Sequence, residues 1–215
     1  MKKLMGLFFA LLPFFSCAKD KSVIMPKVLE TKNMETEKGI EVATFAGGCF
    51  WCTEAVFLEL KGVKTVVSGY IGGKTINPTY SEIGTGNTGH AEAIEITFDP
   101  AVISFGELLE IFFATHDPTT LNRQGADVGT QYRSEIFYHN AAQKELSQDY
   151  IALMTSENTF GKPIVTKISQ APTFYVAEDY HQNYYNQNKT QGYCSYVITP
   201  KIDKLKKLYQ NKLKK

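Results

Sequence analysis

The pattern of hydrophobic and polar positions changes twice along the chain. An apolar stretch runs from Leu4 to Phe15, which is much shorter than the roughly 20 residues that a membrane-spanning helix needs. Residues 18–38 are polar and show no sustained periodicity. From residue 40 onwards, short apolar runs alternate with segments of helical periodicity. The pattern therefore predicts a leader, a tether and one folded domain over residues 40–215.

The folded part is predicted to alternate strands and helices. Strands are expected at residues 41–46, 63–71, 91–98, 131–138 and 163–169. Helices are expected from about Trp51, after Ser104 in a capping box with Glu107, after Asn140, and from Pro200. Two Gly-containing stretches, 72–89 and 117–130, read as loops. This mixed order favours a two-layer α+β sandwich over a doubly wound sheet.

The N-terminus has the pattern of an export signal. Lys2 and Lys3 precede the apolar stretch, and Ser16-Cys17 resembles a bacterial lipobox, in which the Cys is lipidated. We therefore expect residues 1–16 to be a lipoprotein-type signal peptide and residues 17–39 a tether. The product would be an exported, membrane-anchored lipoprotein facing the periplasm or the cell surface. Ordinary export with cleavage nearby, or an uncleaved helix, are the alternatives.

Composition removes several classes of function. The 215 residues contain 23 basic and 22 acidic side chains, so no nucleic-acid partner is expected, and membrane contact is expected through the lipid anchor only. Four Cys are too few for a disulfide scaffold. The four His are not spaced like zinc ligands, so no metal site is expected. The individual chemistry of the Cys residues becomes the main question.

The strongest chemical signal lies around Cys49. Gly48 precedes it and a helix is predicted to follow, so unpaired backbone N–H groups and the helix dipole can stabilise a thiolate. Phe50 and Trp51 add two large apolar faces beside the sulfur. Cys52 completes a Cys-x-x-Cys pair that can form a disulfide. The alternative is that Cys49 is a small buried core residue and the aromatic residues only pack.

Glu92 is the second chemical signal. In the predicted strand 91–98 it shares a face with Ile94 and Ile96, on the more apolar side. Burial there would raise the pKa of the carboxyl and make it a proton donor near neutral pH. The alternative is a solvent-facing Glu on an edge strand.

Several motifs together resemble one known family, the A-type peptide methionine sulfoxide reductases. The matching segments cover about residues 40 to 200 in the family's order: Gly47-Gly48-Cys49-Phe50-Trp51, Gly69-Tyr70-Ile71-Gly72-Gly73, Asn77-Pro78-Thr79-Tyr80, Gly89-His90-Ala91-Glu92-Ala93, Asp127-Val128-Gly129-Thr130-Gln131-Tyr132-Arg133-Ser134 and Gly192-Tyr193-Cys194. The resemblance implies an α+β sandwich with a ferredoxin-like core, a mixed sheet and an irregular C-terminal segment. It also implies reduction of the S epimer of methionine sulfoxide, without a bound cofactor.

The resemblance implies a role for each matching residue. Cys49 would attack the sulfoxide sulfur, and Glu92 would protonate its oxygen. Tyr80 and Tyr132 would donate hydrogen bonds to that oxygen. Phe50 and Trp51 would enclose the S-methyl group of the substrate. Asp127 would help hold the site. His90 would belong to the substrate-binding residues and support Glu92.

Two residues could resolve the sulfenic acid left on Cys49. Cys194 matches the resolving position of many relatives, and the polar, Asn-rich residues 182–191 suggest a segment mobile enough to bring it in. Cys52 stands where many relatives have Gly, although some have Cys. We expect both to take part, with thioredoxin or a similar dithiol as reductant. The expected partners are methionine-sulfoxide-containing proteins, and the chain is expected to be a monomer.

Two other functions remain open at this point. A tethered dithiol-disulfide oxidoreductase would use Cys49 and Cys52 but would not need Glu92 or the Gly-rich loops. A surface-anchored binding module would use Phe50 and Trp51 as a ligand platform and would work without the Cys49 thiol.

Overall fold

The computed structural model describes residues 25–26 and 39–214. The predicted signal peptide and Cys17 lie outside the described residues, as does most of the predicted tether. Two of the described tether residues contact the domain, because the Tyr150 hydroxyl donates a 2.9 Å hydrogen bond to the Pro26 carbonyl and Met25 packs against the core.

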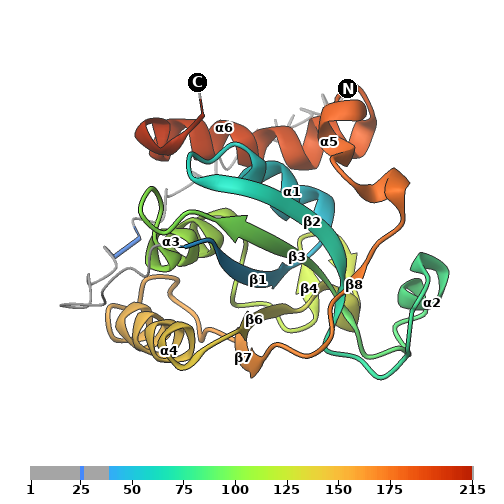
Figure 1. The fold of residues 1–215 in the computed structure, drawn as a ribbon, viewed down its shortest axis with the longest axis horizontal. Coiled ribbons are helices and arrows are strands. Elements are labelled where there is room, and N and C mark those ends of the chain that lie inside the picture. Colours follow the sequence, from blue (N-terminus) through green and yellow to red (C-terminus); the bar gives the residue numbers. More distant parts are fainter. Residues whose placement is uncertain (1–24, 27–38, 215) are drawn as a thin grey trace, which may run out of the picture.

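A six-stranded mixed sheet forms the centre of the fold (Figure 1). Its order is β7-β6-β1-β3-β2-β8, and all neighbours are antiparallel except β6 and β7, which are parallel. The strands are β1 (Glu41–Gly47), β2 (Val63–Ile71), β3 (Ala91–Phe98), β6 (Ser134–Tyr138), β7 (Lys167–Gln170) and β8 (Tyr175–Val176).

The core of this sheet has the ferredoxin-like arrangement that the family resemblance implied. The chain order is β1, α1 (Phe50–Leu58), β2, β3, α3 (Phe105–Thr115) and β6, and these four strands lie in the order β6-β1-β3-β2. Helix α4 (Ala141–Ser156) packs against β6 and β7, and α6 (Thr199–Leu208) packs against α1 and α3. The α+β class and the mixed sheet are confirmed.

The start signals in the sequence act as expected. The Ser104 hydroxyl accepts a hydrogen bond from the Glu107 N–H, and the Glu107 carboxylate accepts one from the Ser104 N–H. This pair of bonds is the predicted capping box of α3. Asn140 caps α4 by accepting from the Gln143 N–H. The bounds of β2 and β3 equal the predicted ranges.

The predicted loops contain short elements that the pattern missed. Residues 72–89 include α2 (Tyr80–Gly84), which begins with its own capping box at Thr79. Residues 117–130 include a small hairpin of β4 (Arg123–Gln124) and β5 (Asp127–Val128). The strands expected from residues 131 and 163 begin later, at residues 134 and 167, and a 3-10 turn occupies residues 130–132. Elements this short have too few residues to show a period.

Helix α1 is buried on both sides. One side packs on β2 and β3, while α5 (Tyr184–Gln187), α6 and a π-helical turn, Cys194–Ile198, cover the other (Figure 1). Seven of its nine residues are therefore buried. The N-terminus of α1 lies between the sheet and the C-terminal part of the chain.

The Asn-rich stretch 182–191 is tied to the domain by side-chain hydrogen bonds. Gln182 accepts from the Ser68 N–H at 2.9 Å and donates to the carbonyls of Ser68 and Ala177. Buried Glu54 of α1 accepts from the N–H groups of Asn183 and Tyr184, at 2.8 and 3.3 Å. These bonds hold the start of the stretch against the domain in this structure.

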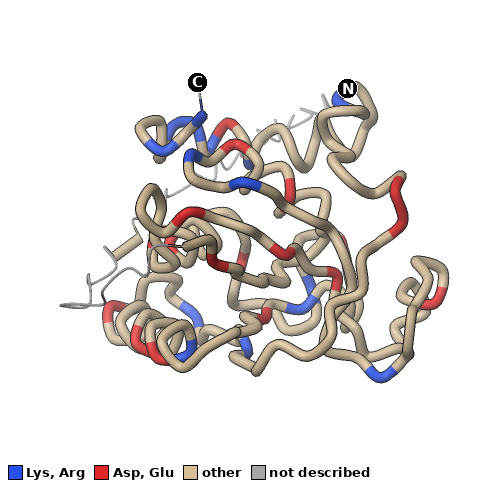
Figure 2. The backbone as a smooth tube through the Cα atoms, in the orientation of Figure 1, with Lys and Arg blue, Asp and Glu red and all other residues tan. Residues whose placement is uncertain are grey.

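Charged residues of both signs are distributed over the fold, with basic residues gathered at the end of α6 (Figure 2). Within residues 25–26 and 39–214, no helix combines the length and hydropathy that crossing a membrane requires.

Candidate active site

Cys49 occupies the turn between β1 and α1. Gly48 has a φ of +96°, and a Cβ at this position would lie 2.5 Å from Cγ of Gln124, so the turn requires glycine. Cys49 itself is the residue before the first turn of α1 and is only 8% exposed. The predicted position of the thiol, at the start of a helix after a Gly turn, is correct.

Glu92 lies beside this thiol, on the strand face that the alternation predicted. It is 2% exposed and belongs to the same side of β3 as Ile94 and Ile96, which are core residues under α1. Its carboxyl accepts a 3.1 Å hydrogen bond from the backbone N–H of Phe50. The alternative of a solvent-facing Glu is therefore excluded.

Both the acid and the thiol are neutral near pH 7 in this structure. Burial raises the pKa of the Glu92 carboxyl to about 8, although the hydrogen bond from Phe50 N–H acts in the opposite direction. Burial also raises the pKa of the Cys49 thiol well above its usual range. Burial of the sulfur therefore opposes the thiolate that the helix N-terminus would favour, and the Phe50 N–H is occupied by Glu92.

Tyr80 and Tyr132 face the same site from two different loops. Tyr80 begins α2, Tyr132 ends the 3-10 turn after β5, and both are half-buried. Burial, together with the charges of Glu92 and Cys49, raises the pKa of Tyr80 to about 12. Burial also raises the pKa of Tyr132, with smaller contributions from Glu92, Tyr80 and Cys49. Each phenol therefore remains a hydrogen-bond donor close to Glu92 and Cys49.

Phe50 and Trp51 form an aromatic wall that the C-terminal segment supports. Phe50 is 1% exposed, and the Trp51 indole stacks on Tyr184 with centroids 3.8 Å apart and an interplanar angle of 8°. The indole N–H donates to Nδ1 of His181 at 3.1 Å. This fixes the orientation of the Trp51 ring.

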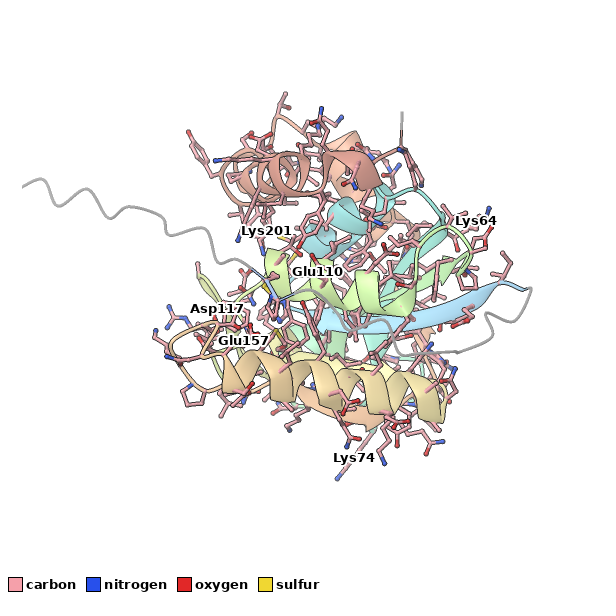
Figure 3. The ribbon with its side chains drawn as sticks, turned by 90° about the vertical axis from the view of Figure 1, so that its left-hand side faces the viewer. Lys64, Lys74, Glu110, Asp117, Glu157 and Lys201 are labelled. Atoms are coloured by element: carbon pink, nitrogen blue, oxygen red, sulfur yellow. The ribbon has the colours of Figure 1, made fainter. Side chains whose placement is uncertain are left out.

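A second thiol cluster surrounds Cys52. The Cys52 sulfur lies 3.7 Å from the Tyr193 hydroxyl, which donates a 2.7 Å hydrogen bond to Asp127. A hydrogen bond with Cys49 is the main cause that lowers the pKa of Cys52 to about 7, with a smaller contribution from Lys201. The side chain of Lys201, a residue of α6, points toward the body of the domain (Figure 3) and donates a 3.1 Å hydrogen bond to the Thr115 carbonyl.

Comparison with known proteins decides the family. The family model described as "Peptide methionine sulfoxide reductase" matches residues 41–213. "Peptide methionine sulfoxide reductase MsrA" of Deinococcus radiodurans is 57% identical over 187 residues, which are 86% of this chain and 91% of that protein. The protein of the same name from Chromobacterium violaceum is 53% identical over 174 residues, 81% of this chain and 99% of that protein.

The chain belongs to the peptide methionine sulfoxide reductase family. A solved structure, "Methionine sulfoxide reductase A of Corynebacterium diphtheriae", superposes with a TM-score of 0.64 at 36% identity and covers 74% of this chain and 79% of that chain. The family, the fold class and the enzyme class that the motifs implied, a peptide-methionine (S)-S-oxide reductase, are confirmed.

His90 of this reductase has a different role from the predicted one. Its Nδ1 accepts a hydrogen bond from the Gly73 N–H at 3.1 Å, and its Nε2 lies 2.8 Å from the Thr75 carbonyl. Both ring nitrogens are occupied, so they are not free for the substrate or for Glu92. His90 instead fixes the Gly-rich loop that leads to Tyr80.

Two residues that the sequence reasoning missed complete the pocket of the reductase. His181 is 1% exposed, and its ring centroid lies 4.3 Å from that of Tyr80 and 5.1 Å from that of Phe50. Glu178 accepts from the Tyr70 hydroxyl at 2.8 Å and from the Tyr80 N–H at 2.9 Å. A single His in an Asn-rich stretch has no periodic signal. In the sequence, the aromatic residues near His181 are the one signal that this stretch contributes to a site.

Cys194 of the reductase directly follows Tyr193 and is fully buried in the π-helical turn. It is close enough to Cys52 for the charge of that thiol to raise its pKa, although burial is the larger cause. Turns of π-helix are frequent at functional sites. All three thiols of the described domain are free in this structure.

The described residues of the reductase contain no cluster of three His, Cys, Asp or Glu side chains that could hold a metal ion.

Proposed function

We propose that this chain reduces the S epimer of methionine sulfoxide, in peptides and as the free amino acid, through attack of Cys49 and proton donation by Glu92. The observation that carries the proposal is the buried Glu92 carboxyl, which has a pKa of about 8 and is hydrogen-bonded to the residue next to Cys49. A neutral acid beside a nucleophile is what removal of a sulfoxide oxygen requires.

The first step balances within the site. The Cys49 sulfur forms a bond to the sulfoxide sulfur as the thiol loses its proton, and the sulfoxide oxygen takes a proton from Glu92. The oxygen then passes to Cys49 as a sulfenic acid, and methionine leaves in reduced form. Glu92 regains a proton equivalent to the one that Cys49 released, so no net proton is consumed. Tyr80 and Tyr132 donate hydrogen bonds to the oxygen as it gains charge.

The aromatic wall explains why this site selects its substrate. Phe50 and Trp51 provide apolar faces for the S-methyl group, while Tyr80 and Tyr132 provide hydrogen-bond donors close to Glu92. A sulfoxide of the wrong hand would place its oxygen against the aromatic rings. The donors would then be left unpaired, which is costly for a buried polar group.

The second half of the reaction resolves the sulfenic acid in two exchanges. Cys52 attacks Cys49, with whose thiol it interacts, and water leaves. Cys194 then receives the disulfide from Cys52 and passes it to thioredoxin or a thioredoxin-like dithiol, which is the reductant. Support comes from the family membership and from the position of Cys52 between the other two thiols.

We place this activity outside the cytoplasm, on a lipid anchor at Cys17, because of the basic, apolar and Ser-Cys pattern over residues 2–17. The substrates would then be oxidised proteins of the cell envelope. Cell fractionation tests this: the chain should follow the membrane fraction and a Cys17→Ser variant should leave it. Equal distribution of both chains would contradict the anchor.

A reductant-free single turnover tests the activity. The purified, fully reduced chain is mixed with each epimer of methionine sulfoxide, and methionine is counted per enzyme. We expect at least about one methionine from the S epimer, none from the R epimer, and none with Cys49→Ser. Mapping of the thiols in the same sample identifies the disulfide. If neither epimer yields methionine and the thiols stay reduced, dithiol exchange without sulfoxide chemistry is favoured instead.

A further inference from the structure

The proton on the Cys52 thiol has a defined acceptor in the structure. The Tyr193 hydroxyl has a single hydrogen, and it donates this hydrogen to the Asp127 carboxylate at 2.7 Å, because a carboxylate can only accept. The 3.7 Å contact with Cys52 must therefore run in the other direction, from the thiol S–H to the Tyr193 oxygen. Cys52, Tyr193 and Asp127 form a directed chain of hydrogen bonds.

We propose that Tyr193 is a catalytic residue of the resolving step, in which its hydroxyl accepts the proton of Cys52 as it passes its own proton to Asp127. The inference rests on the proposed function, since it assumes that Cys52 attacks the oxidised Cys49. It assigns Tyr193 a reaction role and makes Asp127, predicted only to hold the site, the proton acceptor.

The step balances with the groups at hand. Cys52 loses its proton through Tyr193 to Asp127, and its sulfur forms a bond to the sulfur of the Cys49 sulfenic acid. The S–O bond breaks, and the leaving hydroxide takes a proton from Glu92 to become water. Asp127 later returns its proton to solvent, which its half-exposed position allows, and Glu92 is reprotonated. One sulfenic acid and one thiol have become one disulfide and one water.

The surroundings favour this direction of transfer. Tyr193 carries the proton without becoming a phenolate, because burial and the neighbouring thiols raise its own pKa, so it gives up one proton only as it gains another. Lys201 supports the charge that develops on Cys52. The Tyr193 ring is held with its edge to Trp51, with centroids 6.0 Å apart, so the hydroxyl is fixed relative to α1.

The test removes only the hydroxyl. Tyr193→Phe keeps the ring contact with Trp51, and it is made in a Cys194→Ser background so that Cys52 is the one resolving thiol in the described domain. A single turnover of the reduced chain without reductant gives two rates: methionine formation, and loss of the Cys49 sulfenic acid measured by trapping with a cyclic diketone. Their ratio reports the resolving step alone.

The pH profile separates proton relay from packing. The titratable and charged groups that interact with Cys52 are Cys49, Glu92, Asp127, Tyr193, Cys194 and Lys201. With the relay, resolution should be nearly constant from pH 7 to 6, where Glu92 stays protonated and Asp127 can accept the proton. In Tyr193→Phe the rate should fall about ten-fold per unit below pH 7, because Cys52, with a pKa of about 7, then has to lose its proton to solvent. Asp127→Asn should give the same slope.

The matched control is Tyr185→Phe. It also removes one hydroxyl from the C-terminal segment, but this hydroxyl bonds Thr199 at 3.0 Å. The ratio and the pH profile should match the parent. A flat profile in Tyr193→Phe, or an equal loss of both rates at every pH, would overturn the role of Tyr193. If the parent chain makes methionine but forms no Cys49–Cys52 disulfide, the proposed role of Cys52 in resolution falls, and the relay falls with it.

Discussion

The ferredoxin-like core and the C-terminal segment after β7 build the two sides of one active site in different ways. The core holds Cys49 and Glu92 at the ends of regular elements, where backbone hydrogen bonds fix them. The segment contributes His181 and Tyr193, which are fixed by side-chain hydrogen bonds. The core therefore carries the reacting proton and nucleophile, while the segment orients the pocket wall and serves the second thiol.

This difference has an energetic consequence. A carboxyl buried in the sheet must remain protonated, which costs stability at neutral pH, and the rigid strand β3 tolerates it. The segment carries no comparable buried acid, among the residues described, apart from its contact with Glu54 of α1. Changes in the core are thus expected to abolish chemistry, whereas changes in the segment are expected to weaken binding or slow resolution.

The largest expected effect tests the core side. Glu92→Gln keeps the size of the side chain and can still accept the Phe50 N–H, but it cannot give a proton to the sulfoxide oxygen. Methionine formation in a single turnover should fall on the order of 10³-fold. Glu95→Gln, a carboxyl on the opposite face of the same strand, should retain the rate of the parent. A Glu92→Gln chain with the parent's rate would refute the acid role.

The sequence predicted the core side of the active site better than the side built by the C-terminal segment. The bounds of β2 and β3 and the face of Glu92 were predictable because strand alternation and a Gly turn are local signals. The contact of Tyr193 with Cys52 joins residues 141 positions apart. Likewise, Glu54 binds the backbone of residues 183 and 184. Such tertiary hydrogen bonds leave no period in the sequence, so the sequence pattern could not predict them.

The next effect concerns stability. The pKa of Glu92 is about 8 when folded and near 4.5 when unfolded, so this group contributes its full stability below pH 4.5. That contribution is lost as the pH rises to 8, because the unfolded chain releases its proton first. Glu92→Gln lacks this dependence. Its unfolding free energy, relative to the parent, should rise by about 2 kcal/mol between pH 5 and 7 in urea titrations. A constant difference would show that Glu92 is ionised in the folded chain.

The smallest expected effect tests the segment side. His181→Phe keeps an aromatic ring beside Tyr80 but removes the acceptor of the Trp51 indole N–H. Losing one such bond, worth about 1 kcal/mol, should raise KM about five-fold while kcat changes less than about two-fold. Because Trp51 is the only Trp, its emission reports the same bond.

In the parent chain this emission should change on acidification. Burial lowers the pKa of His181, so protonation removes the acceptor at Nδ1 only below about pH 6.5. The His181→Phe chain should lack the transition. If the two chains share the same KM and the same emission profile, the C-terminal segment does not orient Trp51. The division between a reacting core and an orienting segment would then rest only on the contact of Tyr193 with Cys52.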